Sequence, residues 1–323
     1  MSMAIPNKYA VFSSEAYNEI AIKFAASDAE RFQYFPIYWG KFADGTDNIK
    51  IEGFNPRNQI AGRHCLFFAS FHNNDVTFSQ FSVFVVLLQS FIESLTIVLP
   101  FYPVGTMERV IEEGQVATAN TYAILLSNLP FCGKPTRLMI YDIHTLQNRF
   151  YFHHTIISSL HTAIPLLIDK IRSSNDFNII NTVAFPDEGA AKRFGGMFRS
   201  LGFDVITCGK TRVGNRRIVT IQDGDCKDKH LVIVDDLVQT GGTLYECGKA
   251  LKSAGAITVI AFVSHGVFPN NCFADFLPDG KKGDIFDKFF VTNSIPLTTR
   301  NIPKDNIFEV LDLSPQILKD LDL

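Results

Sequence analysis

One stretch, residues 231–243, constrains the fold of this chain more than any other. It reads Leu-Val-Ile-Val-Asp-Asp-Leu-Val-Gln-Thr-Gly-Gly-Thr, so an apolar strand runs into two carboxylates and then into a loop of Gly and Thr. The residues that follow, 244–252, have the spacing of a helix. A buried strand that leads through a loop into a helix is the repeating unit of parallel α/β sheets, where ligands bind beyond the carboxyl ends of the strands. The stretch therefore predicts an α/β fold with a ligand site at 235–243.

The residue types of this loop indicate an anion. Gly241 and Gly242 let the backbone approach a ligand closely, and the N–H groups of the next helix turn point toward it. Thr240 and Thr243 add hydroxyl donors. Carboxylates beside such a cradle suit a sugar phosphate, because they can hold ribose hydroxyls or a magnesium ion while the loop holds the phosphate. Acidic pairs and glycine pairs alone also mark ordinary strand boundaries, so the prediction depends on the whole pattern.

Short apolar segments of the same kind recur along the chain, separated by stretches with helical periodicity such as 116–126 and 190–201. The segments are 65–69, 96–99, 138–141, 182–185, 205–208, 231–234 and 257–263. Strands that alternate with helices indicate parallel sheets covered on both faces. A chain of 323 residues is long enough for two domains. We expect them at 1–157 and 158–323, with the amphipathic end of the chain packing back on the N-terminal domain.

Composition excludes several classes of protein. The chain is 46% hydrophobic and 20% charged with a formal net charge of −3, which is typical of a globular protein and gives no reason to expect nucleic acid or an acidic membrane as partner. Polar residues interrupt the apolar run 81–99, which we interpret as a buried helix followed by a strand. Residues 1–12 lack the pattern of a signal peptide, and the six cysteines lie far apart, so we expect a cytoplasmic protein with reduced thiols.

Two further strand ends carry residues that could join the site. His144 follows Asp142 after an apolar strand, and an imidazole can bind a metal or transfer a proton near neutral pH. Asp187, Glu188 and Gly189 precede a helix whose N–H groups could hold a second phosphate, with Asp187 supporting magnesium. The alternatives are a histidine hydrogen-bonded beneath a loop and an acid that only caps its helix.

A basic segment, 210–217, places four cations around Gly214. Most runs of this kind are solvated hairpins. A mobile basic loop is nevertheless useful in phosphoryl transfer, because it can neutralise the charge that grows on the transferred oxygens. In that interpretation Lys210 and Arg212 close over the reacting group, with Gly209 and Gly214 as hinges.

Two segments of the first half could contact a nucleotide. Phe42 could stack on a base while Asp44 accepts a hydrogen bond from it, although a Phe-Ala-Asp-Gly sequence is usually only a turn. The stretch 100–114 contains Glu108 and Arg109 in an aromatic, glycine-bearing segment. Such a segment suits either a nucleotide-contacting loop or a subunit contact.

Together these segments resemble those of the ribose-phosphate diphosphokinases, also called phosphoribosyl diphosphate (PRPP) synthetases, and in particular the plant-type class II enzymes. The likeness extends over about residues 35–315. It is carried by Leu-Pro-Phe-Tyr-Pro-Val-Gly-Thr-Met-Glu-Arg-Val (99–110), Val-Ala-Thr-Ala (116–119), Tyr-Asp-Ile-His (141–144), Arg-Phe-Tyr-Phe (149–152), Lys-Thr-Arg-Val-Gly (210–214) and Val-Asp-Asp-Leu-Val-Gln-Thr-Gly-Gly-Thr-Leu (234–244). The resemblance implies two tandem phosphoribosyltransferase-like (type I) domains, each a mainly parallel sheet flanked by helices.

The resemblance also implies an activity: transfer of the diphosphoryl group of Mg-ATP to the C1 hydroxyl of ribose 5-phosphate, giving PRPP and AMP. By position it assigns ribose 5-phosphate binding to Asp235, Asp236, Gln239, Thr240, Gly241, Gly242 and Thr243, and the diphosphate loop to Asp187, Glu188 and Gly189. It assigns ATP binding to Phe42, Asp44, Thr106, Met107, Glu108 and Arg109, the magnesium site to His144 and Asp187, and catalysis to Lys210 and Arg212. It implies a homo-oligomer with the ATP site near a subunit interface.

The chain departs from the family pattern at two places. The common PRPP loop has an acid where this chain has Gln239, which weakens a general-base role there. Class I enzymes have an ATP-contacting Arg-Gln pair where Thr106 and Met107 stand. Two other hypotheses remain: a phosphoribosyltransferase that consumes PRPP, which would not need a second α/β unit, and a silent regulatory subunit, which would tend to lose the basic loop and the acids.

Overall fold

A computed structural model describes residues 9–213 and 216–321, with the backbone alone at 210–213 and 216–218. The chain divides into two compact units, Met1–His161 and Thr162–Leu323. The boundary expected at 157/158 falls inside strand β8 (Ile156–His161). That strand pairs in parallel with β7 (Thr136–Tyr141) and so belongs to the first unit.

The first unit is built on a parallel sheet with the strand order β2-β1-β5-β6-β7-β8. Its other strands are β1 (Tyr9–Ser13), β2 (Phe32–Tyr34), β5 (His64–Phe68) and β6 (Ser94–Val98). The predicted segments 65–69, 96–99 and 138–141 therefore correspond to β5, β6 and β7. Every pairing recorded within this sheet is parallel, as the alternation of strands and helices predicts.

Helices cover both faces of this sheet. They are η1 (Glu15–Tyr17), α1 (Asn18–Ser27), α2 (Asn74–Leu88), α3 (Thr118–Ser127) and η2 (Leu146–Tyr151). Because neighbouring residues of a strand point to opposite faces, Phe67 and Phe68 of β5 contact different helices. The ring of Phe84 in α2 lies 4.9 Å from that of Phe67, and the ring of Phe24 in α1 lies 5.1 Å from that of Phe68.

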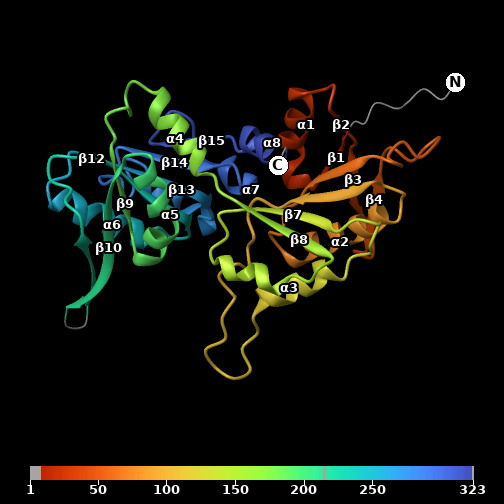
Figure 1. The fold of residues 1–323 in the computed structure, drawn as a ribbon, viewed down its shortest axis with the longest axis horizontal. Coiled ribbons are helices and arrows are strands. Elements are labelled where there is room, and N and C mark those ends of the chain that lie inside the picture. The colour runs from red at the N-terminus through yellow and green to blue at the C-terminus, as the bar shows by residue number, and fades with distance from the viewer. Residues whose placement is uncertain (1–8, 214–215, 322–323) are drawn as a thin grey trace. The chain divides into compact units, whose positions relative to one another are not determined.

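The predicted buried helix at 81–99 is thus the end of α2, followed by β6. No helix in the described ranges is long and apolar enough to cross a membrane. A two-stranded antiparallel hairpin, β3 (Ile37–Lys41) and β4 (Asp47–Ile51), adds to the unit and projects from it (Figure 1). The turn of this hairpin carries Phe42 and Asp44.

The second unit contains the larger sheet, with the order β11-β10-β9-β12-β13-β14-β15. Its strands are β9 (Thr182–Phe185), β10 (Asp204–Val213), β11 (Arg216–Asp223), β12 (His230–Val238), β13 (Thr258–Gly266), β14 (Lys288–Thr292) and β15 (Phe308–Leu311). The recorded pairings are parallel except for that of β10 with β11, which form a long antiparallel hairpin (Figure 1).

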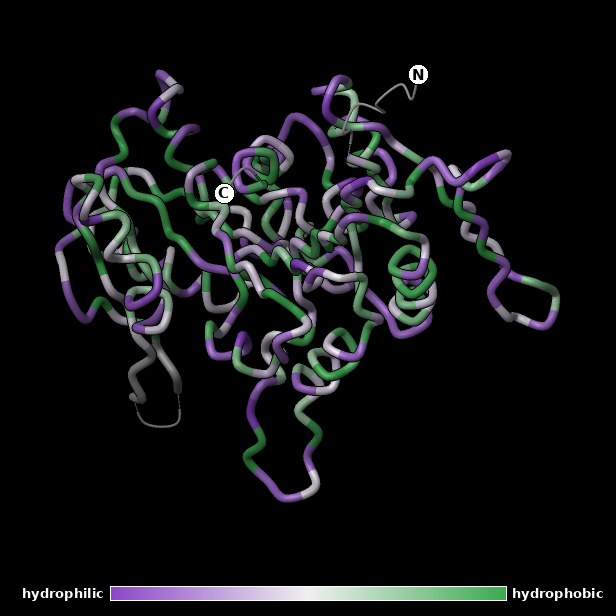
Figure 2. The backbone as a smooth tube through the Cα atoms, turned by 45° about the vertical axis from the view of Figure 1, so that its right-hand side comes forward, coloured by the Kyte–Doolittle hydropathy of each residue, from purple (hydrophilic) through white to green (hydrophobic). Residues whose placement is uncertain are grey.

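Helices also cover this second sheet. They are α4 (Ile164–Ser173), α5 (Glu188–Ser200), α6 (Gly242–Ser253), η3 (Pro269–Phe276), α7 (Pro296–Thr299) and α8 (Ser314–Leu321). Phe198 of α5 packs its ring 6.0 Å from that of Phe185, whereas buried residues of α6 share one hydrophobic cluster with Phe276 and Phe289. Hydrophobic segments follow the strands and many connecting turns are hydrophilic (Figure 2).

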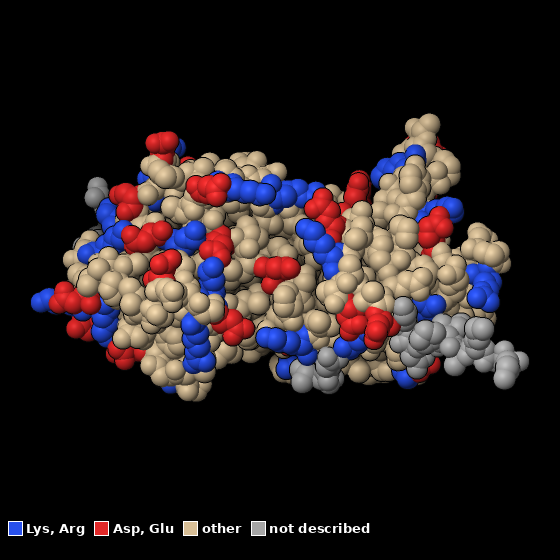
Figure 3. All heavy atoms as spheres, turned by 90° about the horizontal axis from the view of Figure 1, so that it is seen from above, with Lys and Arg blue, Asp and Glu red and all other residues tan. Residues whose placement is uncertain are grey.

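The end of the chain is attached to the second unit. Strand β15 pairs with β14, and Lys319 of α8 lies 3.7 Å from the carboxylate of Asp169 in α4. The expected packing of this end on the N-terminal domain stays a prediction. On the face seen in Figure 3, acidic and basic side chains are interspersed, in keeping with the small net charge.

Candidate active site

The strand order of the second unit indicates where a ligand would bind. Strand β9 lies between β10, the next strand along the chain, and β12, so the connections leave β9 and β12 in opposite directions. Ligands of open α/β sheets bind at such a switch point, beyond the carboxyl ends of the strands. The loop after β9 begins α5 at Glu188, and the loop after β12 begins α6 at Gly242. Two helix N-termini therefore follow the two strand ends.

An acidic cluster occupies the ends of these strands. The backbone N–H of Asp236 donates to Oδ1 of Asp235 over 2.9 Å, and Oδ2 of Asp236 lies 3.7 Å from Nη1 of Arg193 in α5. The side chains of Asp236 and Arg193 are only 9% and 15% exposed. Burial raises the pKa of Asp235 well above its usual range, and the charges of Asp236 and Asp187 add to the rise. The predicted acids of β9 and β12 are thus brought together.

The raised pKa of Asp235 indicates which ligands the acidic cluster can bind. A buried carboxylate close to other carboxylates is stabilised by any donor or cation that approaches it. Sugar hydroxyls are such donors, and magnesium is such a cation. Magnesium usually keeps several waters and takes one or two protein carboxylates together with phosphate oxygens, so a large protein ligand set is not required. The residues present therefore fit a magnesium ion that also binds phosphate.

The glycine loop is open on one side and packed on the other. Gly241 has φ +72° and precedes α6, and its carbonyl accepts the N–H of Tyr245 over 3.0 Å. The N–H groups of Gly242, Thr243 and Leu244 come before that first helical bond, so they have no acceptor within the helix. A Cβ added to Gly242 would meet nothing within 4 Å, whereas one added to Gly241 would overlap the ring of Phe276. The loop therefore leaves room for an anion at the helix N-terminus.

The second predicted loop begins with a helix cap. Oδ1 of Asp187 accepts the backbone N–H of Ala190 over 3.0 Å, so Asp187 is the N-cap of α5. Helix capping was the alternative interpretation of Asp187, and the carboxylate caps the helix while its charge also acts on Asp235. Glu188 and Lys192 form a 2.8 Å ion pair in which both side chains are largely exposed. Glu188 is thus a solvated side chain in this structure.

The basic segment is a hairpin rather than a loop at residues 210–213. Lys210 pairs with Val219 and Arg212 with Arg217 in the antiparallel ladder of β10 and β11. The strand predicted at 205–208 is therefore longer than expected and includes both residues. Gly214 lies outside the described residues, as do the side chains of Lys210 and Arg212, so the catalytic roles of these two cations stay predictions.

In the first unit, η2 ties the loop 100–114 to the end of β7. The hydroxyl of Tyr151 donates to the carbonyl of Glu108 over 2.7 Å, and Nδ2 of Asn148 donates to the carbonyl of Gly105 over 3.0 Å. Thr145, next to His144, donates to Oε1 of Glu108 over 3.2 Å. Sequence reasoning missed these supporting residues, although Tyr151 lies in the family-like motif at 149–152.

The predicted ATP-binding residues of this loop are not equivalent. The Glu108 side chain is only 10% exposed and its Oε1 lies 3.1 Å from Nε of Arg109. Met107 is 49% exposed, and Thr106 and Arg109 are also exposed. The loop itself reaches away from the rest of the unit (Figure 1). Glu108 therefore shapes the loop, and its neighbours present their side chains to solvent.

The hairpin turn carries the other predicted nucleotide contacts. Phe42 is 56% exposed, which leaves its ring accessible for stacking. Oδ1 of Asp44 accepts two hydrogen bonds from Thr46, one from the hydroxyl over 2.6 Å and one from the backbone N–H over 3.0 Å. These bonds lower the pKa of Asp44. Asp44 first stabilises its own turn, as the alternative interpretation proposed.

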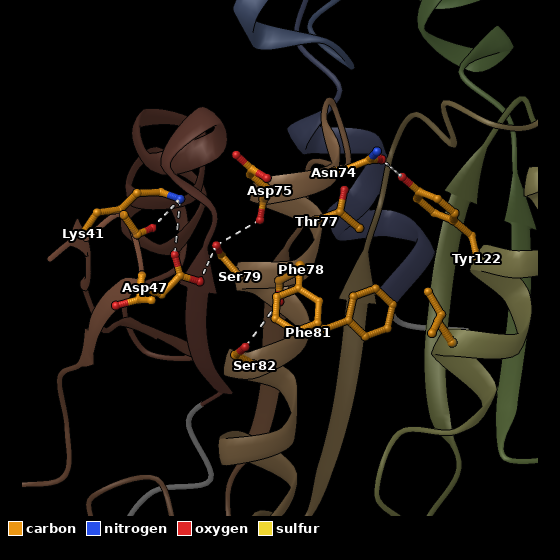
Figure 4. Close-up of a pocket in the computed structure, with 13 residues that line it drawn as sticks. Lys41, Asp47, Asn74, Asp75, Thr77, Phe78, Ser79, Phe81, Ser82 and Tyr122 are labelled. Atoms are coloured by element: carbon orange, nitrogen blue, oxygen red, sulfur yellow. Dashed lines mark hydrogen bonds and ion pairs between the residues drawn. The ribbon is translucent and has the colours of Figure 1, made fainter. Parts of the chain in front are cut away.

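Beside this turn lies a pocket of about 620 Å³ that sequence reasoning did not predict (Figure 4). The hairpin, α2 and α3 contribute its walls. Oδ2 of Asp47 accepts the hydroxyl of Ser79 over 2.7 Å, and Tyr122 donates to Asn74 over 3.3 Å. Four of the polar side chains that line the pocket are therefore engaged in pairs.

Comparison with known proteins decides the family. Residues 162–272 match the family described as phosphoribosyl transferase domain. Ribose-phosphate pyrophosphokinase 4 of Oryza sativa subsp. japonica is 44% identical over 316 residues, which are 97% of this chain and 95% of the rice protein. The chain belongs to the ribose-phosphate pyrophosphokinase family. Ribose-phosphate pyrophosphokinase 3, chloroplastic, of Arabidopsis thaliana is 41% identical, over 97% of this chain and 75% of that protein.

The fold of this ribose-phosphate pyrophosphokinase family member agrees with a solved structure. The crystal structure of phosphoribosylpyrophosphate synthetase from Mycobacterium smegmatis superposes with a TM-score of 0.77 over 98% of both chains, at 23% identity. The predicted α/β fold with phosphoribosyltransferase-like domains is confirmed. The rice relative matches both units, which a phosphoribosyltransferase with a single such unit would not do.

Within the described residues, no three His, Cys, Asp or Glu side chains gather at a ready-made metal site. His144 belongs to the first unit and Asp187 to the second, so their pairing at one magnesium ion stays a prediction. His144 is exposed, at the segment that follows β7. The six cysteines are free in the structure.

Proposed function

We propose that this enzyme transfers the diphosphoryl group of Mg-ATP to the C1 hydroxyl of ribose 5-phosphate, which yields PRPP and AMP. One observation carries the proposal: the open glycine loop at the N-terminus of α6 comes shortly after Asp235 and the buried Asp236, whose carboxylates lie close together. A phosphate and a diol need these two environments side by side. Membership of the ribose-phosphate pyrophosphokinase family supports the choice of substrate.

On the acceptor side, the backbone N–H groups of Gly241, Gly242, Thr243 and Leu244 would hold the 5-phosphate. A helix N-terminus favours negative charge, because its N–H groups are unpaired and the helix dipole is positive there. Asp235 and Asp236 would accept hydrogen bonds from the ribose hydroxyls. Arg193 fixes the second of these carboxylates, so the sugar would meet acceptors that are already oriented.

On the donor side, the C1 oxygen would attack the β-phosphorus of ATP. A bond forms between this oxygen and the β-phosphorus, and the bond from that phosphorus to the oxygen that bridges it to the α-phosphorus breaks. AMP leaves with that bridging oxygen, and the proton of the C1 hydroxyl passes to solvent. Lys210 and Arg212, on the β10–β11 hairpin, would neutralise charge on the phosphoryl oxygens. Magnesium would supply further charge neutralisation when bound, and Asp187 and His144 are proposed to support it.

The nucleotide would be held by the first unit. The exposed ring of Phe42 would stack on the adenine, with Asp44 and the loop 106–109 completing the contacts. Both segments project from the first unit, which supports the proposal that the ATP site lies near a subunit interface of a homo-oligomer (Figure 1). The cytoplasmic location stays a prediction, since one relative is named chloroplastic.

The proposal is tested by incubating the purified chain with ribose 5-phosphate, ATP and magnesium, and following the reaction by phosphorus NMR. PRPP and AMP should appear in equal amounts, and neither should form when ribose 5-phosphate or ATP is omitted. Release of ADP instead would show transfer of a single phosphoryl group and refute the proposal. A chain that releases no AMP would favour the silent regulatory subunit.

A further inference from the structure

Segment 269–283 lies directly behind the glycine loop of the second unit. It consists of η3 and the turns that follow, and the backbone N–H of Lys282 donates to the carbonyl of Asp275 over 2.7 Å, which closes the segment on itself. This segment contacts the loop at two carbonyl groups. Sγ of Cys272 donates to the carbonyl of Gln239 over 3.4 Å, and Nζ of Lys282 donates to the carbonyl of Thr240 over 2.6 Å.

Lys282 itself is held in place by three interactions. Its ammonium lies 3.4 Å from Oδ2 of Asp275 and 4.9 Å from the centre of the Phe276 ring, besides its bond to Thr240. Only 17% of the side chain is exposed. A lysine on a surface turn ordinarily keeps several rotamers, so this fixed arrangement indicates a specific task. Its neighbour Lys281 is exposed.

The bond to Thr240 determines which way the loop presents its peptide groups. In a trans peptide the C=O and the next N–H point in opposite directions. Because Lys282 holds the Thr240 carbonyl on one side, the N–H of Gly241 is directed to the other. The same bond keeps a carbonyl oxygen, which would repel an anion, turned away from the open side of the loop.

Phe276 supports the loop at the next residue. The ring lies so close to Gly241 that any side chain there would overlap it. Gly241 also has φ +72°, a conformation that other residues adopt at a cost. The ammonium of Lys282 lies over this ring, so the lysine and the ring contact two adjacent residues of the loop, Thr240 and Gly241.

We propose that Lys282, supported by Asp275 and Phe276, is a positioning residue that fixes the Thr240–Gly241 peptide for binding the phosphate of the sugar substrate. This inference rests on the proposed function of the loop and deepens it. Lys282 acts through the backbone of Thr240 and does not itself touch the substrate. Its loss should therefore weaken ribose 5-phosphate binding and leave ATP binding unchanged.

The test compares Lys282→Met with Lys281→Met in the full chain. Methionine keeps the length and apolar stem of lysine but removes the charge and the donors, and the neighbouring variant controls for loss of one positive charge. Calorimetric titration with ribose 5-phosphate should show binding about tenfold weaker in Lys282→Met, equivalent to about 1.4 kcal/mol. KM for ribose 5-phosphate should rise by a similar factor, with KM for ATP and kcat within about twofold of wild type.

Amide hydrogen exchange provides a second readout that a purely structural role would not reproduce. Residues 239–245 should exchange faster in Lys282→Met while β12 and β13 stay protected. Lys282→Gln keeps a polar tip but is too short to reach the carbonyl, and it should show the same selective loss. Faster exchange throughout the second unit, with equal effects on both substrates, would assign the lysine to stability and overturn the proposal.

Failure of the proposed function is distinguishable from failure of this inference. A wild-type chain that binds ribose 5-phosphate but forms no PRPP would refute the function, while the titration still decides the role of Lys282. Unchanged binding in Lys282→Met, with an active wild-type chain, would refute only the lysine's role. A wild-type chain that does not bind ribose 5-phosphate would refute both.

Discussion

Alanine substitution at the adjacent loop glycines, Gly241 and Gly242, should have different consequences. Gly241→Ala should lower the stability of the fold, and Gly242→Ala should weaken ribose 5-phosphate binding. At Gly241 the methyl group would overlap the Phe276 ring, and the backbone has φ +72°. The left-handed conformation costs about 1–2 kcal/mol and overpacking about 1–3 kcal/mol, so Gly241→Ala should destabilise the second unit by about 2–5 kcal/mol. For a unit of this size that corresponds to a melting temperature lower by about 5–15 °C.

At Gly242 the added methyl group would meet nothing within 4 Å, and the residue begins α6 with φ outside the left-handed region. Gly242→Ala should therefore fold at least as stably as wild type, because alanine restricts the unfolded chain. Its methyl group would nevertheless stand at the mouth of the proposed phosphate site. We expect KM for ribose 5-phosphate to rise at least about tenfold, a loss of about 1.4 kcal/mol of binding.

The assay combines thermal unfolding without ligand and steady-state kinetics for both variants. We expect Gly241→Ala to lower the melting temperature and Gly242→Ala to preserve it while losing ribose 5-phosphate affinity. If Gly242→Ala bound ribose 5-phosphate as wild type does, the open side of the loop would not be the phosphate site. Equal melting temperatures for the two variants would show that the Phe276 ring does not restrict the residue at position 241.

Three further predictions concern charge and nucleotide contacts. Lys210→Ala should lower kcat by about 100-fold or more with little change in ribose 5-phosphate affinity, and unchanged AMP release would remove Lys210 from the mechanism. Burial raises the pKa of Asp235 in the fold, so the folded state binds more protons than the unfolded state and stability falls as pH rises above the ordinary aspartate range. Asp235→Asn should therefore melt higher than wild type at pH 7, with the gain shrinking toward pH 4, and a pH-independent difference would contradict this. Phe42→Ala should raise KM for ATP alone, and a wild-type value would show that the ring does not contact the base.

The strands that sequence predicts correctly are those with unbroken apolar runs. Strands β5, β7, β9 and β12 are buried over nearly their whole length, because helices cover both faces of each sheet. Strand β8 was missed because it contains Ser158 and Ser159 and lies at the edge of its sheet, half-exposed. Strand β2 has only three residues, too few for a periodic signal.

The residues of the site also differ in whether the sequence reveals them. Asp235, Asp236 and the glycine loop are adjacent in sequence, so their shared role is visible as one pattern. The residues that support the loop are not: Lys282 contacts Thr240 across 42 positions of sequence, and Tyr151 contacts Glu108 across 43. Such contacts arise only when the chain folds, and a surface lysine or a tyrosine carries no local signal of them.

The central claim is that backbone N–H groups at the start of α6 hold the phosphate of a pentose monophosphate. A crystal of the chain grown with ribose 5-phosphate and Mg-ADP tests it most directly. We expect the 5-phosphate oxygens to lie about 3 Å from the backbone nitrogens of Gly242, Thr243 and Leu244. A sugar phosphate bound elsewhere, with those three N–H groups facing water, would contradict it.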